Sequence, residues 1–263
     1  MPFMGKVSGR QRLEGIAGAL IALVFVGCGG TPPTPSAPSV RTPTSQPTAS
    51  ASSRPECTNP EGGVCLNTVK AGTYTTVEFT PQLTYSVPDD WQNLEDTPGN
   101  FLLVAPGYSL EGVNAGGSDF IGVYTSVKAE NRKCDTEEEA GSDQPGVAHT
   151  PQAMASDFQK RPGLVTTQPK PVSIGGLTGL VMDLRLAPGW TGTCFYANGQ
   201  PVVQLIGGVP PSGLDHPIVP GLTMRLYLLQ RADTTLAVEI EDFADGAHLD
   251  SYSKIVHKLM FGS

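Results

Sequence analysis

Short runs with the composition of β-strands recur from residue 74 to residue 241, and turn residues separate most of them. Val, Ile, Leu, Phe, Tyr and Thr are frequent in the runs, whereas Gly, Pro, Asn and Asp mark the gaps, which is typical of strands joined by tight turns. The pattern therefore restricts the centre of the chain mainly to β structure. The expected strands cover residues 74–79, 83–87, 101–105, 120–127, 164–172, 177–186, 222–230 and 234–241.

Two segments instead have the spacing of amphipathic helices. Residues 151–160 follow Thr150, a favourable N-cap, and end before Pro162. A second helix is expected over residues 247–260, because its apolar side chains recur at helical spacing. Strands combined with such helices predict an α+β fold. The shared face of the second helix holds Leu249, Tyr252, Ile255, Val256 and Leu259.

The segment before residue 57 cannot belong to that fold. Residues 29–56 are almost entirely Pro, Thr, Ser, Ala and Gly, and Val40 is their only sizeable apolar side chain. We interpret residues 28–56 as a Pro/Thr/Ser-rich tether. Residues 57–263 have the length of one domain with a sizeable core, so the sequence predicts one globular α+β domain behind the tether.

The first 28 residues have the layout of an export signal. Three basic residues precede the uncharged segment 15–26, and the small residue Gly27 precedes Cys28. This layout resembles the lipobox of bacterial lipoproteins, in which the cysteine receives a diacylglycerol thioether and becomes the mature N-terminus. The resemblance implies a signal peptide at residues 1–27, lipidation of Cys28, and a location at the extracytoplasmic face of the cell membrane.

One position departs from that pattern, because Phe25 stands where lipoboxes usually carry Leu. Two alternatives to lipidation stay open: a free cysteine beside an ordinary cleavage site, and an uncleaved anchor helix. The uncharged segment is shorter than the roughly 20 residues that span a bilayer core, which favours the lipid anchor.

The charge balance excludes one class of partner. Without residues 1–27, which hold three basic residues and Glu14, the 17 basic and 25 acidic residues become 14 and 24, a net charge of −10. Nucleic-acid binders show the opposite sign, so nucleic acid is not expected as a partner. Attraction to anionic lipids is not expected either, and membrane attachment must therefore come from acyl chains.

Four cysteines remain after Cys28, namely Cys57, Cys65, Cys134 and Cys194. An even number of cysteines in an exported domain predicts two disulfides. Of the three possible pairings we favour Cys57 with Cys65 and Cys134 with Cys194, because the first pair closes a short loop beside the tether. Zinc is the alternative, but the separations are too wide for a CxxC-type knuckle, so no metal or other cofactor is expected.

No sequence motif identifies a catalytic residue. The chain has no GxSxG elbow, and we interpret Ser118 and Ser212 as loop serines. Residues 175–179 are rich in glycine, but they lead into another strand, which predicts a hairpin turn rather than a phosphate loop. The four histidines form no HExxH pair. Of these, His216 could meet a distant carboxylate, although a surface-loop histidine is the simpler interpretation.

Charged side chains alternate with apolar ones in three of the expected strands. If these strands are neighbours, the alternation predicts one sheet face with mixed charges. Such a face is explained either by cross-strand ion pairs in solvent or by a polar ligand groove. The candidate binding residues on it are Arg185, Arg225, Tyr227, Glu239 and Glu241.

A Gly/Pro-rich insertion, residues 187–221, supplies the other candidates. Trp190, Phe195 and Tyr196 surround Cys194, and aromatic rings on loops often form recognition surfaces. They could equally pack as a lid over the core. The acidic run 137–139 could bind calcium but has no EF-hand pattern, and we interpret it as a solvated loop.

Two short motifs and the order of elements resemble a known family. The motifs are YSVPDDW at residues 85–91 and PVSIGGLTGL at residues 171–180, and a long hairpin followed by a C-terminal helix comes after them. Together they resemble the PsbP-like (Mog/PsbP) fold of lumenal photosystem subunits and actinobacterial lipoproteins. The resemblance implies a central antiparallel sheet flanked by helices. Family members of this kind are mostly binding or assembly modules, and the resemblance supplies no catalytic residues.

These observations lead to one functional hypothesis and two alternatives. The first is a non-catalytic, lipid-anchored module that binds a protein or another component of the cell envelope. The second is a carrier that holds a lipid or other apolar ligand beneath the insertion. A secreted hydrolase is the third.

Overall fold

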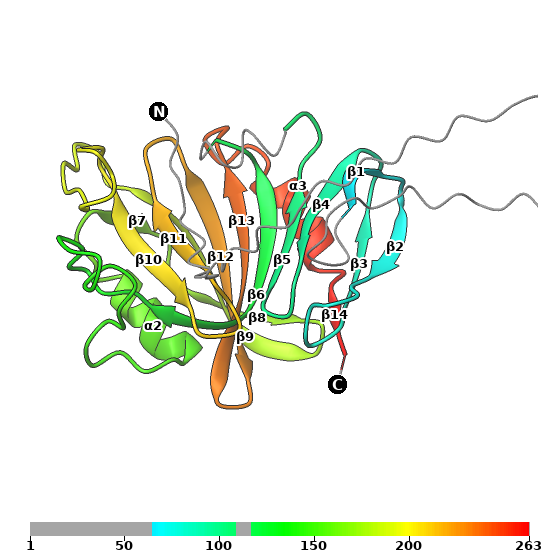
Figure 1. Cartoon of the computed structure of the whole chain (residues 1–263), viewed down its shortest axis with the longest axis horizontal. Coiled ribbons are helices and arrows are strands. Elements are labelled where there is room, and N and C mark those ends of the chain that lie inside the picture. Colours follow the sequence, from blue (N-terminus) through cyan, green and yellow to red (C-terminus); the bar gives the residue numbers. More distant parts are fainter. Residues whose placement is uncertain (1–64, 109–116, 263) are drawn as a thin grey trace, which may run out of the picture. The chain divides into compact units, whose positions relative to one another are not determined.

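A computed structural model describes residues 65–108 and 117–262 of the chain. The signal segment, the tether and Cys57 lie outside the described residues. The main feature of the described chain is one antiparallel sheet, and Figure 1 shows its path from β1 at one edge to β7 at the other. In spatial order the strands are β1 (Cys65–Val69), β4 (Trp91–Asp96), β5 (Asn100–Val104), β6 (Phe120–Ala129), β13 (Thr234–Asp242), β12 (Thr223–Arg231), β9 (Leu177–Leu186) and β7 (Leu164–Thr166).

Three further strands extend this sheet, and three others form a small second sheet. Strand β8 (Lys170–Ile174) pairs with β9, while β10 (Val203–Gly208) pairs with both β6 and β11 (Asp215–Ile218). The small sheet has the order β14 (Met260–Phe261), β3 (Leu83–Val87) and β2 (Gly72–Thr75). All these pairings are antiparallel.

Alternation along the long strands builds a core on each face of the main sheet. One core joins Val238 and Ile240 to the apolar face of α3 (Leu249–Val256) and to the small sheet. The other joins Leu226 and Leu228 to α2 (Pro151–Phe158) and to the β10–β11 pair. The sheet is therefore buried on both sides, with one short helix against each face.

Both helices occur where the sequence predicts them, but they are shorter. The side chain of Thr150 accepts a hydrogen bond from the Ala153 amide at 3.3 Å, which confirms the predicted N-cap of α2. Helix α3 ends at Val256 rather than at residue 260. The cause is β14, which pairs with β3 and needs an extended backbone from Met260 onward.

The two-residue turn between β8 and β9 confirms the predicted hairpin at the glycine-rich segment. Ile174 pairs with Leu177, which leaves Gly175 and Gly176 as the turn, with φ values of 56° and 86°. Positive φ at both positions is the type I′ geometry that glycine adopts without strain.

Several expected elements are corrected by the structure. The expected strand at 164–172 is two strands, β7 and β8, because the regular pairing with β9 is interrupted between Thr166 and Lys170, where only Thr167 still bonds Asp183. The strand at 74–79 ends at Thr75, since the Asp96 carboxylate accepts the amides of Val77, Glu78 and Phe79 and so bonds this backbone outside a ladder. Strand β4 was not expected.

The insertion 187–221 is the largest correction, since it contributes β10 and β11 to the main sheet. Its Gly and Pro residues fall mainly in the connections, whereas Leu205, Ile206 and Ile218 are fully buried. The fold is thus dominated by the antiparallel sheet, and the two short helices fit the expectation of flanking helices only loosely. Among the helices of the described residues, none is long and apolar enough to cross a membrane.

Candidate functional site

The charged strand residues do not share one face, contrary to the sequence-based expectation. The three strands are neighbours, but Arg225 pairs with Ile240, and Leu226 pairs with Glu239. This register follows from the short turn that joins Arg231 to Thr234. Arg225 and Tyr227 therefore face α3, whereas Glu239 and Glu241 lie on the opposite side of the sheet.

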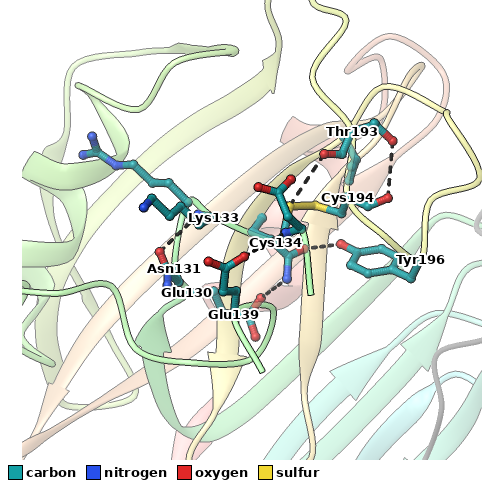
Figure 2. Close-up of a disulfide and its surroundings, with 12 residues drawn as sticks. Glu130, Asn131, Lys133, Cys134, Glu139, Thr193, Cys194 and Tyr196 are labelled. Carbon is teal, nitrogen blue, oxygen red and sulfur yellow. Dashed lines mark hydrogen bonds between the residues drawn. A yellow bond between two sulfur atoms is a disulfide. The ribbon is translucent and has the colours of Figure 1, made fainter. Parts of the chain in front are cut away.

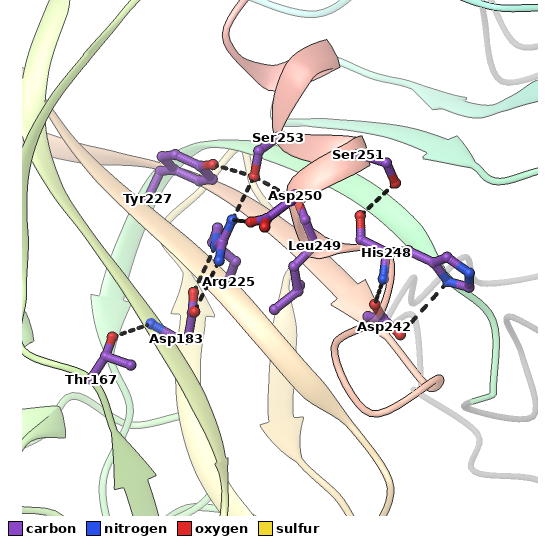
Figure 3. A network of polar contacts seen from close by, with 10 residues as sticks. All are labelled: Thr167, Asp183, Arg225, Tyr227, Asp242, His248, Leu249, Asp250, Ser251 and Ser253. Carbon is purple, nitrogen blue, oxygen red and sulfur yellow. Dashed lines mark hydrogen bonds and ion pairs between the residues drawn. The ribbon is translucent and has the colours of Figure 1, made fainter.

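Arg225 forms the centre of a polar network between the sheet and α3 (Figure 3). Its Nε and Nη2 donate to the two carboxylate oxygens of Asp183 at 2.7 and 3.0 Å. Its Nη1 donates to Asp250 at 2.8 Å and to the Ser253 hydroxyl at 3.0 Å. Hydrogen bonding to Asp183 raises the pKa of Arg225 above its already high usual value, so the guanidinium is permanently charged. The cross-strand ion pair is confirmed for Arg225 and Asp183.

A half-open groove of about 560 Å³ runs beside this network, between α3 and strands β8, β9 and β12. Tyr227 forms part of its wall, and its hydroxyl donates to Ser253 at 2.9 Å. Lys170, Lys254 and His257 line the groove with exposed side chains. Arg185 lies on the same strand face as Asp183 and is exposed. The charged face has two possible explanations, a cross-strand ion pair and a polar groove, and this side of the sheet contains both.

The insertion and the loop that follows β6 are joined by the predicted Cys134–Cys194 disulfide (Figure 2). Its Cα atoms lie 5.0 Å apart, and both cysteines are buried. The other predicted pair, Cys57 with Cys65, involves a residue outside the described part of the chain. The buried disulfide fixes residues 194–197 against the loop after β6, where Phe195 N donates to Cys134 O at 2.9 Å.

The aromatic residues of the insertion have different environments. The Trp190 indole N–H donates to Val202 O at 3.0 Å. The ring also lies against Gly163 and Gly192, where an added Cβ would come within 2.5 and 2.2 Å of it. Phe195, in contrast, is 50% exposed and touches Tyr196 edge to face. Trp190 is therefore packed within the fold, whereas half of the Phe195 side chain is exposed to solvent.

A buried acidic network lies below the disulfide. Gln204 Nε2 donates to Glu130 Oε2 at 2.6 Å, and the Tyr196 hydroxyl donates to Gln204 Oε1. Glu130 is 1% exposed, and its burial together with the nearby charge of Asp215 raises its pKa to about 8. This network had no signal in the sequence, because its members are separated by up to 85 residues.

His216 is not a surface-loop histidine, as the simpler interpretation had it. Its side chain lies beside Glu239, on the sheet face that α2 and the β10–β11 pair cover. Its Nδ1 is 2.5 Å from Glu239 Oε1 and 3.8 Å from Glu241 Oε1. Strand alternation indicates Glu239 and Glu241 as candidates, but the register places them on the sheet face opposite Arg225. Their actual neighbour is a histidine from the insertion.

A second carboxylate–histidine cluster caps α3. Asp242 accepts the amides of Ala244 and His248, both at 2.6 Å. Asp119 accepts the Phe243 amide at 2.9 Å, and its other oxygen lies 2.8 Å from His248 Nδ1. Burial and the charge of Asp119 raise the pKa of Tyr252, whose hydroxyl donates to the same carboxylate. These bonds fix the turn before α3, as the His248 and Asp242 side chains in Figure 3 show.

The remaining candidates are loop residues, as their sequence context indicates. The Ser212 hydroxyl donates to Asn100 Oδ1 at 2.7 Å, which ties the insertion to the start of β5. Ser118 is buried beside Asp119. In the acidic run, Glu137 and Glu138 are exposed.

Comparisons with known proteins add little to this geometry. No family model matches the chain, and no curated protein matches it. One similar solved structure is a crystal structure of a protein from Bacteroides thetaiotaomicron VPI-5482, with 11% identity and a TM-score of 0.30. The match covers 69% of this chain but only 45% of that protein, so it spans less than half of the Bacteroides chain.

A second similar structure is the solution structure of PsbP (CyanoP) from Synechocystis sp. PCC 6803. It has 8% sequence identity and a TM-score of 0.35, and the match covers 74% of this chain and 95% of that one. The structural neighbours of the chain thus include a PsbP-like protein, at low identity.

Proposed function

We propose that the chain is a binding module of the bacterial cell envelope, held at the extracytoplasmic face of the membrane by a lipid on Cys28. The segment that ends at Cys28 supports the extracytoplasmic location, and the buried Cys134–Cys194 disulfide is consistent with an oxidising compartment. We also propose that the domain is PsbP-like and that the chain is an actinobacterial lipoprotein. It rests on the two motifs, which form the β3–β4 connection and the β8–β9 hairpin.

The groove beside α3 is the observation that favours binding. Arg225 is held by Asp183, Asp250 and Ser253, so it shapes the wall rather than offering free donors. Lys170 and Lys254 are exposed at the groove. The lining therefore carries three cationic side chains against two carboxylates, in a chain whose net charge is −8.

A local positive surface on an acidic protein selects its partner by charge. The groove suits an anionic group of an envelope protein or polymer, bound between the two lysines. The carrier function has less support, because the space beneath the insertion is filled by buried apolar side chains such as Leu205, Leu214 and Ile218.

Charge reversal tests the groove. The full chain with Lys170→Glu and Lys254→Glu should lose the partner that co-purifies from its own membranes, measured by native mass spectrometry. The matched control is Lys133→Glu with Lys160→Glu, two exposed lysines outside the groove, which should keep the partner. Both groove lysines are exposed, so the melting temperature should stay within a few degrees.

Three results would count against this function. Equal retention of the partner by both double variants would place binding elsewhere. A co-purified lipid in place of a protein or polymer would favour the carrier. Turnover of a generic ester or peptide, abolished by a serine or histidine substitution, would favour the hydrolase.

A further inference from the structure

Three side chains converge between β11 and β13, on the sheet face that α2 covers. His216 comes from β11, and Glu239 and Glu241 come from β13. One potential ligand atom of each lies within 4.8 Å of the other two. Glu239 is completely buried, whereas the side chains of Glu241 and His216 are 11% and 26% exposed. The cluster is thus internal but open to solvent on one side.

The neighbouring strand β6 lies beside this cluster and contributes the side chains that contact it. Gly122 lies opposite Glu239, and Phe120 lies opposite Glu241. An added Cβ at Gly122 would come within 2.2 Å of the Tyr124 hydroxyl, so glycine is needed for the tyrosine to reach across. That hydroxyl donates to Glu239 Oε1 at 2.6 Å.

Two aromatic rings orient the imidazole. Phe120 and Tyr124 contact His216 edge to face, with ring centroids at 5.8 and 5.4 Å. A buried glutamate with a tyrosine donor and a histidine held by two rings is a preorganised set of ligand atoms, similar to the supported ligands of protein metal sites.

Hydrogen bonding leaves this set incomplete. Glu239 Oε2 is buried and has no hydrogen-bond partner, whereas His216 Nδ1 lies in an ion pair, 2.5 Å from Glu239 Oε1. Buried charged oxygens are almost always bonded, and an ion is one usual reason for an exception. Glu239 therefore has a buried carboxylate oxygen that the protein itself does not use, and it lies in the group whose other members are a histidine and a second glutamate.

The other acidic clusters differ in this respect. In the Asp119–Asp242–His248 cluster, backbone amides, His248 and Tyr252 occupy the carboxylate oxygens. That cluster is accounted for as the cap of α3, and it serves below as the matched control.

We propose that His216, Glu239 and Glu241 form a binding site for one divalent transition-metal ion, with Zn²⁺ as the reference ion. Imidazole and carboxylate ligands at about 2.0–2.2 Å suit Zn²⁺, and two carboxylates neutralise its charge. Three protein ligands leave a coordination position open toward the exposed edge of His216. The site lies on the sheet face opposite the α3 groove, so it does not depend on the proposed partner.

The test uses the full-length, untagged chain after chelator treatment and dialysis, titrated with ZnCl₂ alone. Calorimetry should give one Zn²⁺ per chain, and Co²⁺ in its place should give visible absorption bands of a low-coordinate site. His216→Gln and Glu241→Gln should each weaken Zn²⁺ binding by about a hundredfold or more, since loss of even an outer-shell partner costs about 10–100-fold. His248→Gln should bind as the unchanged chain does.

The outcomes separate cleanly. Absence of Zn²⁺ binding at micromolar concentration, or equal binding by the unchanged chain and both site variants, overturns the proposal. Loss of binding in His248→Gln alone would assign the ion to the other cluster and overturn it too. If His216→Gln fails to fold, Glu241→Gln decides, because glutamine has the shape of a protonated glutamate. A Zn²⁺-dependent rise in melting temperature should be present in the unchanged chain and absent in that variant.

Discussion

At the scale of single residues, Glu130 shows how burial changes the state of an acid. The side chain lies at the junction of β6 with β10, where an added Cβ on Gly207 would come within 2.3 Å of its Oε1. Desolvation and the charge of Asp215 raise its pKa from 4.5 to about 8. Glu130 is therefore protonated in the folded protein at neutral pH, whereas in the unfolded chain it is ionised.

This difference makes stability depend on pH. The folded-state pKa lies above the unfolded value, so the contribution of Glu130 is complete below about pH 4.5 and is lost as pH rises toward 8. Glu130→Gln should remove this loss, because the amide cannot ionise and still accepts from Gln204. The stability of the variant relative to the unchanged chain should increase from pH 5 to pH 8, by roughly 3–5 kcal/mol in total.

Urea unfolding at several pH values measures this difference. The control is Glu138→Gln, an exposed carboxyl group, which should leave the pH dependence unchanged. Parallel stability curves for Glu130→Gln and the unchanged chain would show that Glu130 is ionised in the fold.

Residue pairs were predictable from the sequence only where strand alternation determined them. Arg225 and Asp183 alternate with apolar residues on strands that were both expected, and they form an ion pair. His216 and Glu239 also pair, but the histidine is on a strand that the sequence did not predict. Without the path of the insertion, nothing in the sequence relates residue 216 to β13.

At the scale of elements, the insertion combines a packed part with an exposed part. Trp190 lies against two glycines, Gly163 and Gly192, and bonds Val202 O. Trp190→Ala should therefore lower the free energy of unfolding by about 2–4 kcal/mol, through lost contacts and a cavity. Phe195→Ala, at a ring that is 50% exposed, should lower it by less than about 1 kcal/mol.

Denaturant midpoints of the two variants test this contrast, and Phe195→Ala serves as the matched control. Equal losses of stability would mean that the packing around Trp190 contributes little. Loss of the partner in Trp190→Ala without loss of stability would instead make Trp190 a recognition residue.

Elements were predictable where hydrophobic alternation or capping was strong. Strands β3 and β9 and helix α2 began where their patterns predicted. The sequence did not show β10 and β11, because glycines and prolines fill the segments around them and their pairing partners are distant. Pairing of β10 with β6 near Ala129 supplies the missing stabilisation, and that is a tertiary property.

At the scale of the whole molecule, the folded body and its attachment are separate features. The antiparallel sheet with a core on each face was predictable as an α+β fold, although the two predicted helices are shorter than expected. The proposed attachment to a membrane rests on the sequence alone. If the proposed cleavage removes residues 1–27, the remaining net charge of −10 gives no attraction to anionic membranes, so release from the membrane should follow from loss of the proposed lipid.

Cys28→Ser tests this separation. The variant should no longer be processed at Gly27 as a lipoprotein, and any matured protein should move from the membrane fraction to the soluble extracytoplasmic fraction, since two acyl chains are needed for stable anchoring. Its melting temperature should equal that of the detergent-solubilised parent, because a segment with the composition of residues 28–56 is not expected to contribute to the core. Ser36→Ala, within the tether, is the control and should stay with the membrane. Continued processing and membrane fractionation of Cys28→Ser would mean that residues 15–26 act as an uncleaved anchor or that the body itself binds a membrane component.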